Sequence, residues 1–328
     1  MTKMKKILAL GLAGVLAVGF AACSNSGAAD EKKDEAATAK TGFAVISQIK
    51  EDEYNKSATA LEIDSVAAAV LVDADGKVID VKIDEAQTKP DLTKDAGNVE
   101  DLRTKLAKQG DYGMKNASPI QKEWFEQVAA FEAWAKGKTA DEIKAGVDET
   151  GYATDADLKA GCTIYANGFT SVVAKAIAQA TDCGAKATDT LKLSLATSKS
   201  YQSNETNLEY DTDYAAVTLD AQGKITSCII DASQAKCSIE NGEFTVAKGE
   251  YKSKKELKEE YNMKGASPIG KEWYEQAAHF ESWAIGKTAA EVKACIGDDM
   301  KPSDADLAAG CTITISSIAN NVANAATL

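Results

Sequence analysis

The chain repeats itself once over most of its length. Tyr112–Ile120 recurs as Tyr261–Ile269, an offset of 149 (261 − 112), and the same offset carries Trp124 onto Trp273. Upstream, a second pair of matching segments is offset by 147 (223 − 76). Solenoid repeats span about 20–50 residues, so this longer period indicates two copies of a domain. We expect the copies at 41–182 and 183–328, each long enough for its own core.

Strands are predicted first in each copy. Apolar patterning predicts opening strands at 43–49 and 191–196. A hairpin follows in each copy, because Asp75-Gly76 and Gln222-Gly223 lie between two short apolar runs. A glycine-containing turn between alternating apolar residues is a strong hairpin signal.

Helices are predicted after the hairpins. They begin at Ser118-Pro119 and Ser267-Pro268, since serine favours the N-cap and proline the first turn. Gln121 would complete a capping box in the first copy. Further helices are predicted from Thr139 and Thr288, and final amphipathic helices at about 168–180 and 316–326. The predicted fold class is α+β, with two tandem duplicated domains, each an antiparallel sheet with helices packed on it.

A seven-residue pattern precedes each final helix. Asp157-Leu-Lys-Ala-Gly-Cys-Thr163 recurs as Asp306-Leu-Ala-Ala-Gly-Cys-Thr312. A Ser or Thr three residues before each aspartate suggests that the aspartate lies in the first turn of a short helix. The glycine of each pattern suits the left-handed residue that closes such a turn.

This pattern, followed by isoleucine and a helix, resembles the covalent flavin-attachment motif of FMN-binding domains. Such domains occur in the C subunit of the sodium-pumping NADH:quinone reductase and in tandem-domain flavinylated lipoproteins of Gram-positive bacteria. The resemblance implies two FMN groups, joined by a flavin transferase to Thr163 and Thr312 through phosphoester bonds. It also implies cofactor contacts from the rest of the pattern, namely Asp157, Gly161, Cys162, Asp306, Gly310 and Cys311. Ala160 and Ala309 depart from the family, where serine is common, and the cysteines stand where alanine is common.

Each of these residues also has an ordinary structural interpretation. The threonines could be helix caps or strand residues, and the aspartates plain caps. Cys162 and Cys311 could be small buried side chains. An apolar stripe through Trp124, Val128 and Phe131 favours core packing.

Two other tryptophans, Trp134 and Trp283, are the better candidates for flavin contact. The only histidine, His279, is expected to be a surface or core residue and not a ligand.

The N-terminus resembles that of a bacterial lipoprotein. Three lysines precede an apolar run that is too short to span a bilayer, and the run ends at Phe20-Ala-Ala-Cys23. We therefore expect a signal peptide at 1–22, lipidation of Cys23 and a flexible tether at 23–40. The alternative is a simple secretory signal cut near Ala22. A diacylated cysteine would hold the protein on the outer face of the cell membrane.

Charge and composition exclude several classes of protein. The net charge is −13, or −16 once the three signal-peptide lysines are removed (−13 − 3), which argues against nucleic-acid binding. A single histidine argues against a Ser-His-Asp hydrolase and histidine-rich metal sites. No Cys-x-x-Cys or phosphate-binding glycine motif occurs, so no metal site and no catalytic residue is predicted.

The expected function is that of an extracellular, membrane-anchored electron carrier. Electrons would come from a membrane oxidoreductase or a quinone-linked donor and pass to an extracellular acceptor. Such a carrier needs no substrate turnover of its own. The alternative is a solute- or peptide-binding surface lipoprotein without flavin.

Overall fold

The structure is a computed structural model that describes residues 37–52, 60–90, 99, 101–201, 207–240 and 243–328. The expected signal peptide at 1–22, the lipidation site Cys23 and the tether up to residue 36 lie outside the described residues. From Ala36 to Leu328 the chain forms one compact unit.

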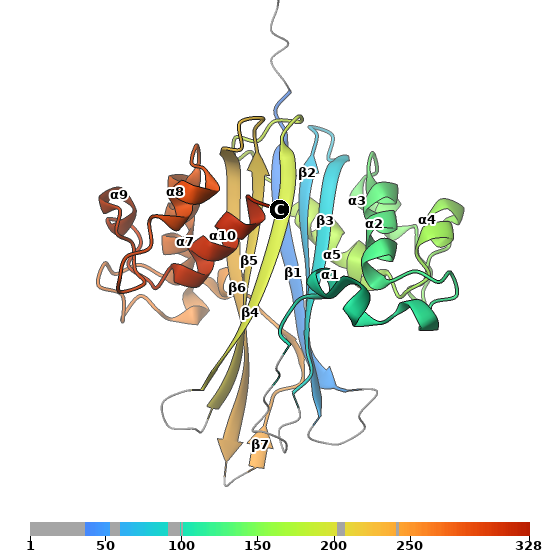
Figure 1. Cartoon of the computed structure of the whole chain (residues 1–328), viewed down its shortest axis with the longest axis horizontal. Coiled ribbons are helices and arrows are strands. Elements are labelled where there is room, and N and C mark those ends of the chain that lie inside the picture. Colours follow the sequence, from blue (N-terminus) through green and yellow to red (C-terminus); the bar gives the residue numbers. More distant parts are fainter. Residues whose placement is uncertain (1–36, 53–59, 91–98, 100, 202–206, 241–242) are drawn as a thin grey trace, which may run out of the picture. The chain divides into compact units, whose positions relative to one another are not determined.

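Two antiparallel sheets form the centre of this unit (Figure 1). The first has the strand order β3-β2-β1-β8 and the second the order β4-β5-β6-β7. The strands are β1 (Lys40–Glu51), β2 (Leu61–Val72), β3 (Val78–Thr88), β4 (Thr190–Tyr201), β5 (Asn207–Leu219), β6 (Ile225–Glu240), β7 (Glu243–Thr245) and β8 (Gly249–Tyr251). With helices packed on these sheets, the predicted α+β fold class is confirmed.

The predicted hairpins are confirmed. Strands β2 and β3 pair around Gly76, and β5 and β6 pair around Gly223. Both glycines have positive φ, 77° and 75°, which L-residues with a side chain rarely adopt. Asp73 fixes the first turn, because its Oδ1 accepts from the backbone N–H groups of Asp75 and Lys77.

Helices follow the strands in the same order in both halves. The first half contains α1 (Lys105–Lys108), α2 (Trp124–Ala135), α3 (Ala140–Lys144), α4 (Ala156–Gly161) and α5 (Asn167–Ala178). The second contains α6 (Lys254–Leu257), α7 (Trp273–Ala284), α8 (Ala289–Lys293), α9 (Ala305–Ala308) and α10 (Ser316–Ala325). Thr139 and Thr288 cap α3 and α8 in capping boxes, as the sequence predicts. The final helices also match their predicted ranges closely.

The predicted starts at Ser118-Pro119 and Ser267-Pro268 are wrong. Helices α2 and α7 begin five residues later and are capped by Glu123 and Glu272, each in a capping box with the glutamate three residues on. The serine instead begins a tight turn, in which the N–H of Gln121 donates to the Ser118 carbonyl at 3.0 Å. Gln121 has a positive φ of 54°, which is incompatible with a continuous helix there.

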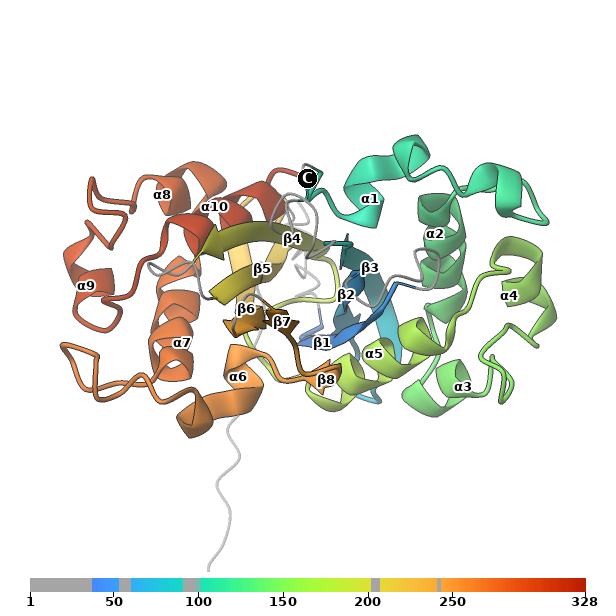
Figure 2. The same cartoon turned by 90° about the horizontal axis from the view of Figure 1, so that it is seen from below.

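Each sheet buries both of its faces. Along β2, Ala68 and Val70 contact the helices of the first half, whereas Ala67 and Ala69 pack against the second sheet. This follows from the period of two in a strand, and it explains why β2 is continuously apolar from Val66 to Val72. Figure 2 shows the helices on the outer sides of the two sheets.

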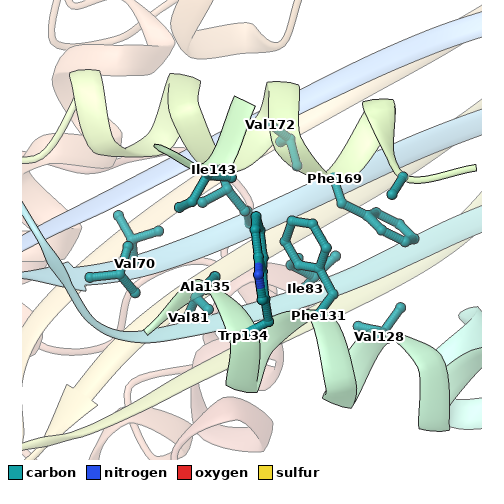
Figure 3. Packing of buried hydrophobic residues seen from close by; sticks show 14 of the residues in the cluster. Val70, Val81, Ile83, Val128, Phe131, Trp134, Ala135, Ile143, Phe169 and Val172 are labelled. Carbon is teal, nitrogen blue, oxygen red and sulfur yellow. The ribbon is translucent and has the colours of Figure 1, made fainter. Parts of the chain in front are cut away.

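The outer core of the first half is rich in aromatic side chains. Phe131 and Trp134 of α2 lie 5.6 Å apart between ring centroids and face α5, as Figure 3 shows. Phe169 of α5 contacts both Phe131 and Trp124 edge to face. The predicted core stripe of α2 is therefore confirmed, and it holds α2 and α5 against the sheet.

The two halves share backbone contacts. Strand β8, from the second half, pairs with β1 along Ser47, Gln48 and Ile49. At the other end, the Ala39 N–H donates to the Ala185 carbonyl at 3.0 Å. Residues from Ala37 to Ala39, which the sequence predicts to be part of a flexible tether, thus pair with the second half.

No helix in the described ranges is both long and apolar enough to cross a membrane.

Candidate functional site

Thr163 and Thr312 are held by the same hydrogen bonds in the two halves. The backbone N–H of Thr163 donates to Gln127 Oε1 at 2.9 Å, and its hydroxyl lies 3.2 Å from the same oxygen. Thr312 makes the corresponding bonds to Gln276 Oε1, at 2.8 and 3.2 Å. Both threonines are partly exposed, so each hydroxyl is oriented from inside and reachable from outside.

The glutamine amides are fixed in turn. Gln127 and Gln276 are fully buried, at 0 % exposure. The Nε2 of Gln127 donates to Ser118 Oγ at 3.1 Å, and the Nε2 of Gln276 donates to Ser267 Oγ at 3.1 Å. The serines that fail to cap the helices thus end a Ser–Gln–Thr chain of hydrogen bonds in each half.

The sequence interpretation missed these glutamines, although a signal was present. Gln127 lies three residues after Trp124 and four before Phe131, on the apolar face of α2. A polar residue there needs partners inside the core. Gln276 recurs at the same position of the second copy, which marks the residue as part of the site.

The other residues of the seven-residue pattern lie around each threonine. Asp157 and Asp306 are exposed in the first turns of α4 and α9, as predicted. The N-caps are Asp155 and Asp304, one residue after the Thr and Ser that the sequence suggested.

Cys162 and Cys311 are fully buried, and burial raises the pKa of each thiol to about 11. They occupy the positions of small core side chains. All six cysteines in the described ranges are free thiols.

Gly161 and Gly310 do not have the predicted left-handed conformation. Neither has a positive φ, and Gly161 is the last residue of α4. Glycine is required for a different reason, because the backbone at both positions lies close to a neighbouring helix. A Cβ at 161 would lie 2.6 Å from the Cβ of Ala130, and one at 310 would lie 2.4 Å from Cγ of His279. The missing side chains let α4 and α9 contact α2 and α7 directly.

A cavity of about 530 Å³ lies beside Thr163. Its volume is within the range of about 300–1,000 Å³ that small-molecule sites have. Apolar and aromatic walls come from Trp124, Phe169 and Ile164, and Tyr152 and Tyr165 stand at the rim, 49 % and 55 % exposed. Charged residues of the sheet and of α1 complete the lining: Lys50, Glu62, Asp64 and Glu85 from the strands, and Lys105 from the helix.

Lys105 is the most buried cation in this lining. Its ammonium lies 2.7 Å from Glu85 Oε1 and 5.1 Å from the Tyr112 ring centroid. Burial alone would lower the pKa of Lys105, but the charges of Glu85, Tyr112 and Asp64 outweigh it and raise the pKa. Lys105 therefore stays protonated in its ion pair with Glu85.

The carboxyl groups of β2 are close to one another and to cations. Lys50 Nζ lies 2.9 Å from Glu62 Oε1 and 3.0 Å from Asp64 Oδ2. Burial and the charges of Glu85 and Glu62 raise the pKa of Asp64 to about 7. Burial also opposes ionisation of Glu62, but its hydrogen bonds to Asp64, Lys89 and Lys50 lower the Glu62 pKa. Glu62 is therefore ionised, and Asp64 is partly protonated near neutral pH.

The second half keeps the cation and its aromatic contacts. Lys254 lies 5.2 Å from the Tyr261 ring centroid and 5.6 Å from that of Trp273. Its acidic neighbours differ, because Ala232 stands at the place of Glu85 and Asp213 at the place of Val66. Lys50 is also replaced, since Ser200 faces Glu209 where Lys50 faces Glu62.

The tyrosine pair belongs to the first half alone. The rings of Tyr152 and Tyr165 meet edge to face with centroids 6.0 Å apart. At the offset of 149 their places are taken by Lys301 and Thr314. Gly151, whose added Cβ would lie 2.2 Å from the Tyr165 ring, is correspondingly replaced by Met300.

Trp134 and Trp283 lie away from the threonines. Trp134 is in the core against Phe131 and Gly146, and Trp283 Nε1 donates to Asp304 Oδ1 at 3.0 Å. Trp124, and not Trp134, lines the cavity with Thr163. His279 is partly buried, and its Nε2 lies 2.9 Å from the Asp306 carbonyl, so it links α7 to α9.

A second cavity, of about 470 Å³, lies between the two halves. Phe43 and Tyr274 provide apolar surface, and Lys255 and Lys258 line it with charged groups. Neither threonine lines this cavity.

Within the ranges that the structure describes, no three His, Cys, Asp or Glu side chains are grouped as metal ligands. Comparison with known proteins gives no match to a family model, a curated protein or a solved structure.

Proposed function

We propose that this protein is an electron carrier that holds FMN on Thr163 and Thr312 and is anchored to the outer face of the cell membrane through Cys23. The observation that carries the proposal is the repeated Ser–Gln–Thr chain. Fully buried Gln127 and Gln276 present a threonine hydroxyl at the surface in the same way twice. A hydroxyl with only a packing role would not need a buried amide in both halves.

The residues around Thr163 fit a phosphate-linked aromatic cofactor. Helix α5 begins four residues after Thr163, and no side chain caps its first turn. Its first N–H groups and the positive end of its dipole suit a phosphate joined to the threonine. Beyond that point the cavity offers aromatic walls and the buried cation of Lys105.

The threonine network supports attachment by a separate enzyme. Attachment breaks the threonine O–H bond and the phosphoanhydride P–O bond of a dinucleotide donor such as FAD, forms the new O–P bond and releases the mononucleotide AMP. The threonine proton must pass to a base. Gln127 orients the hydroxyl of Thr163 but cannot accept its proton, because a neutral amide is not a base at physiological pH. In this proposal the flavin transferase supplies the base, and exposed Asp157 and Asp306 are available to contact it.

When bound, FMN would supply the redox chemistry. The chain supplies a covalent tether, orientation through Gln127 and Gln276, and a partly closed cavity. Electrons would arrive from a membrane oxidoreductase or quinone-linked donor and leave to an extracellular acceptor. A diacylated Cys23 would keep both flavins near such a donor.

The test is co-expression of the chain with a flavin transferase. Intact mass should show two FMN groups, and Thr163→Val and Thr312→Val should each remove one. The double variant should carry none and lose in-gel flavin fluorescence. Valine keeps the backbone hydrogen bond to the glutamine, so the variants should remain folded.

Thr314→Val is the matched control, because Thr314 is an exposed threonine two residues from Thr312. It should retain both flavins. Unmodified threonine peptides in protein purified from its native host would overturn the proposal.

A solute-binding role is the second candidate, and the cavity between the halves favours it. That cavity combines apolar surface from Phe43 and Tyr274 with the ammonium groups of Lys255 and Lys258. This role predicts a colourless protein and no effect of the threonine substitutions. Mass and visible absorption of the same samples therefore distinguish the two functions.

A further inference from the structure

Asp64 of β2 has an unused hydrogen-bonding atom beside Thr163. Its Oδ2 lies 3.0 Å from Lys50 Nζ. Its Oδ1 is buried and has no hydrogen-bond partner among the described residues. The residue is only 3 % exposed and lines the cavity with Thr163. A buried polar atom without a partner costs about 1–3 kcal/mol, so its presence points to a partner that binds in the cavity.

The second half contains the same feature. Asp211 of β5 corresponds to Asp64 by the offset of 147 (211 − 64), and its Oδ1 is also buried without a hydrogen-bond partner. Only one other buried side-chain atom in the described ranges, Trp134 Nε1, shares this condition. Recurrence at one position of the repeat indicates a function that both halves share.

The surroundings of Asp64 favour a proton on the unused oxygen. Five titratable groups from the neighbouring elements act on Asp64 or are affected by its charge: Lys50 of β1, Glu62 of β2, Glu85 of β3, Lys105 of α1 and Tyr251 of β8. Burial and the two glutamates raise the pKa of Asp64 to about 7. Oδ2 faces the ammonium of Lys50, and Asp64 also hydrogen-bonds Glu62, so Oδ1 is the oxygen left to contact a ligand and donates to it when it carries the proton.

We propose that Asp64 and Asp211 each hydrogen-bond the polar edge of the heteroaromatic ring bound beside the threonine of the same half. This inference rests on the proposed function and names a second contact for the cofactor. The threonine would hold the phosphate end, and the aspartate would contact ring carbonyl or ring nitrogen atoms. Such a hydrogen bond stabilises the ring more after it has accepted electrons, because negative charge then develops on those atoms.

The experiment uses the Thr312→Val chain, which should carry one flavin, on Thr163. Three further substitutions are compared in it: Asp64→Leu, Asp64→Asn and Glu132→Gln. Intact mass counts the flavin, and spectroelectrochemical titration measures its midpoint potential. Glu132 is a suitable control because it is a buried carboxyl that does not line this cavity.

We expect Asp64→Leu to lower the midpoint potential, since the ring loses its donor. Asp64→Asn should keep the potential near that of the parent, because the carboxamide still donates. Glu132→Gln should leave it unchanged. A purely structural role for Asp64 would not produce this separation between leucine and asparagine.

The results distinguish the two proposals. Flavin mass with an unchanged potential in Asp64→Leu overturns the role of Asp64 and leaves the proposed function standing. Absence of flavin mass from the parent overturns both.

If Asp64→Leu does not fold, the parent and Asp64→Asn are compared at pH 6 and pH 8. The potential of the parent should vary more with pH, because Asp64 titrates in that interval. Equal pH dependence overturns the inference. Asp211→Leu and Asp211→Asn in the Thr163→Val chain repeat the test for the second half.

Discussion

The two threonine sites share their internal support and differ at the surface that a ligand would meet. In both halves a buried glutamine holds the threonine, and one aspartate oxygen of the central strand is buried without a hydrogen-bond partner. Only the first site has the Tyr152–Tyr165 pair and the Lys105–Glu85 ion pair. The shared hydrogen bonds to the threonines indicate the same chemistry at both sites. The different surrounding residues indicate that a ligand would meet two different environments.

Replacing the glutamines should have the largest effect on stability. Gln127→Met leaves the N–H and hydroxyl of Thr163 without their acceptor, and we expect a loss of about 2–4 kcal/mol in the free energy of unfolding. Gln276→Met should cost a similar amount, because Thr312 is bonded in the same way. Urea denaturation measures both values. A small loss at only one site would show that the two supports are not equivalent.

Replacing the two close-approach glycines, Gly161 and Gly310, should reduce stability by different amounts in the two halves. Gly161→Ala forces a Cβ against the Cβ of Ala130, which cannot rotate away, and we expect a loss of about 1–3 kcal/mol. Gly310→Ala meets the ring of His279, which can turn at the expense of its contact with the Asp306 carbonyl. We expect about 1 kcal/mol there. Gly168→Ala is the control, since nothing lies within 4 Å of its added Cβ. Equal losses at 161 and 310 would contradict this account.

The buried glutamates Glu132 and Glu281 should differ in their pH dependence. Burial raises the pKa of Glu132 to about 7, above its value in the unfolded chain. The folded state then binds the proton more tightly, so this contribution to stability is present at low pH and is lost as pH rises towards 7. Glu132→Gln keeps an acceptor for the Ile83 N–H and removes the loss of stability that ionisation of Glu132 causes at higher pH. We expect the variant to gain about 1 kcal/mol relative to the parent between pH 5 and pH 8.

The matched variant is Glu281→Gln, whose free energy of unfolding should increase less than that of Glu132→Gln. Glu281 has an ion pair with Lys255, and the substitution leaves that ammonium without its partner. Urea denaturation at pH 5 and pH 8 measures the change in the free energy of unfolding for both variants at both pH values. A gain for Glu132→Gln that is the same at both pH values would exclude titration as its cause.

The smallest effect concerns flavin emission and depends on the proposed function. A phenol ring near an excited flavin quenches its fluorescence by electron transfer. The flavin on Thr163, beside Tyr165, should therefore emit more weakly than the flavin on Thr312, where Thr314 takes that place. Tyr165→Thr should reduce the difference. The check is emission per flavin in the Thr163→Val and Thr312→Val chains, with the flavin counted by mass.

The repeat and the local patterns predicted most of the fold. The hairpins at Gly76 and Gly223 and the capping boxes from Thr139 and Thr288 depend on neighbouring residues, so they were predictable. The start of α2 was not, because Ser118 and Gln121 fit the capping-box pattern, whereas the observed cap, Glu123, is not a usual N-cap residue. Only the tertiary contact of Ser118 with Gln127 decides between them.

The candidate site was predictable only in part. The threonines lie in a repeated pattern that the sequence shows directly. Asp64 lies about 100 residues before Thr163 in the chain, and the two residues come close only when the chain folds. Gly161 was recognised as a required glycine, but the reason lies in Ala130 on another helix. Sequence periodicity carries no information on such long-range contacts.

Strand β8 has a consequence for any attempt to separate the two halves of the chain. Its residues Gly249–Tyr251 belong to the second copy by sequence but complete the sheet of the first. A protein ending before the second copy would leave Ser47–Ile49 without this neighbour, and open strand edges promote self-association. The two halves are therefore not independent units, and a chain shortened to the first half should self-associate through this open edge.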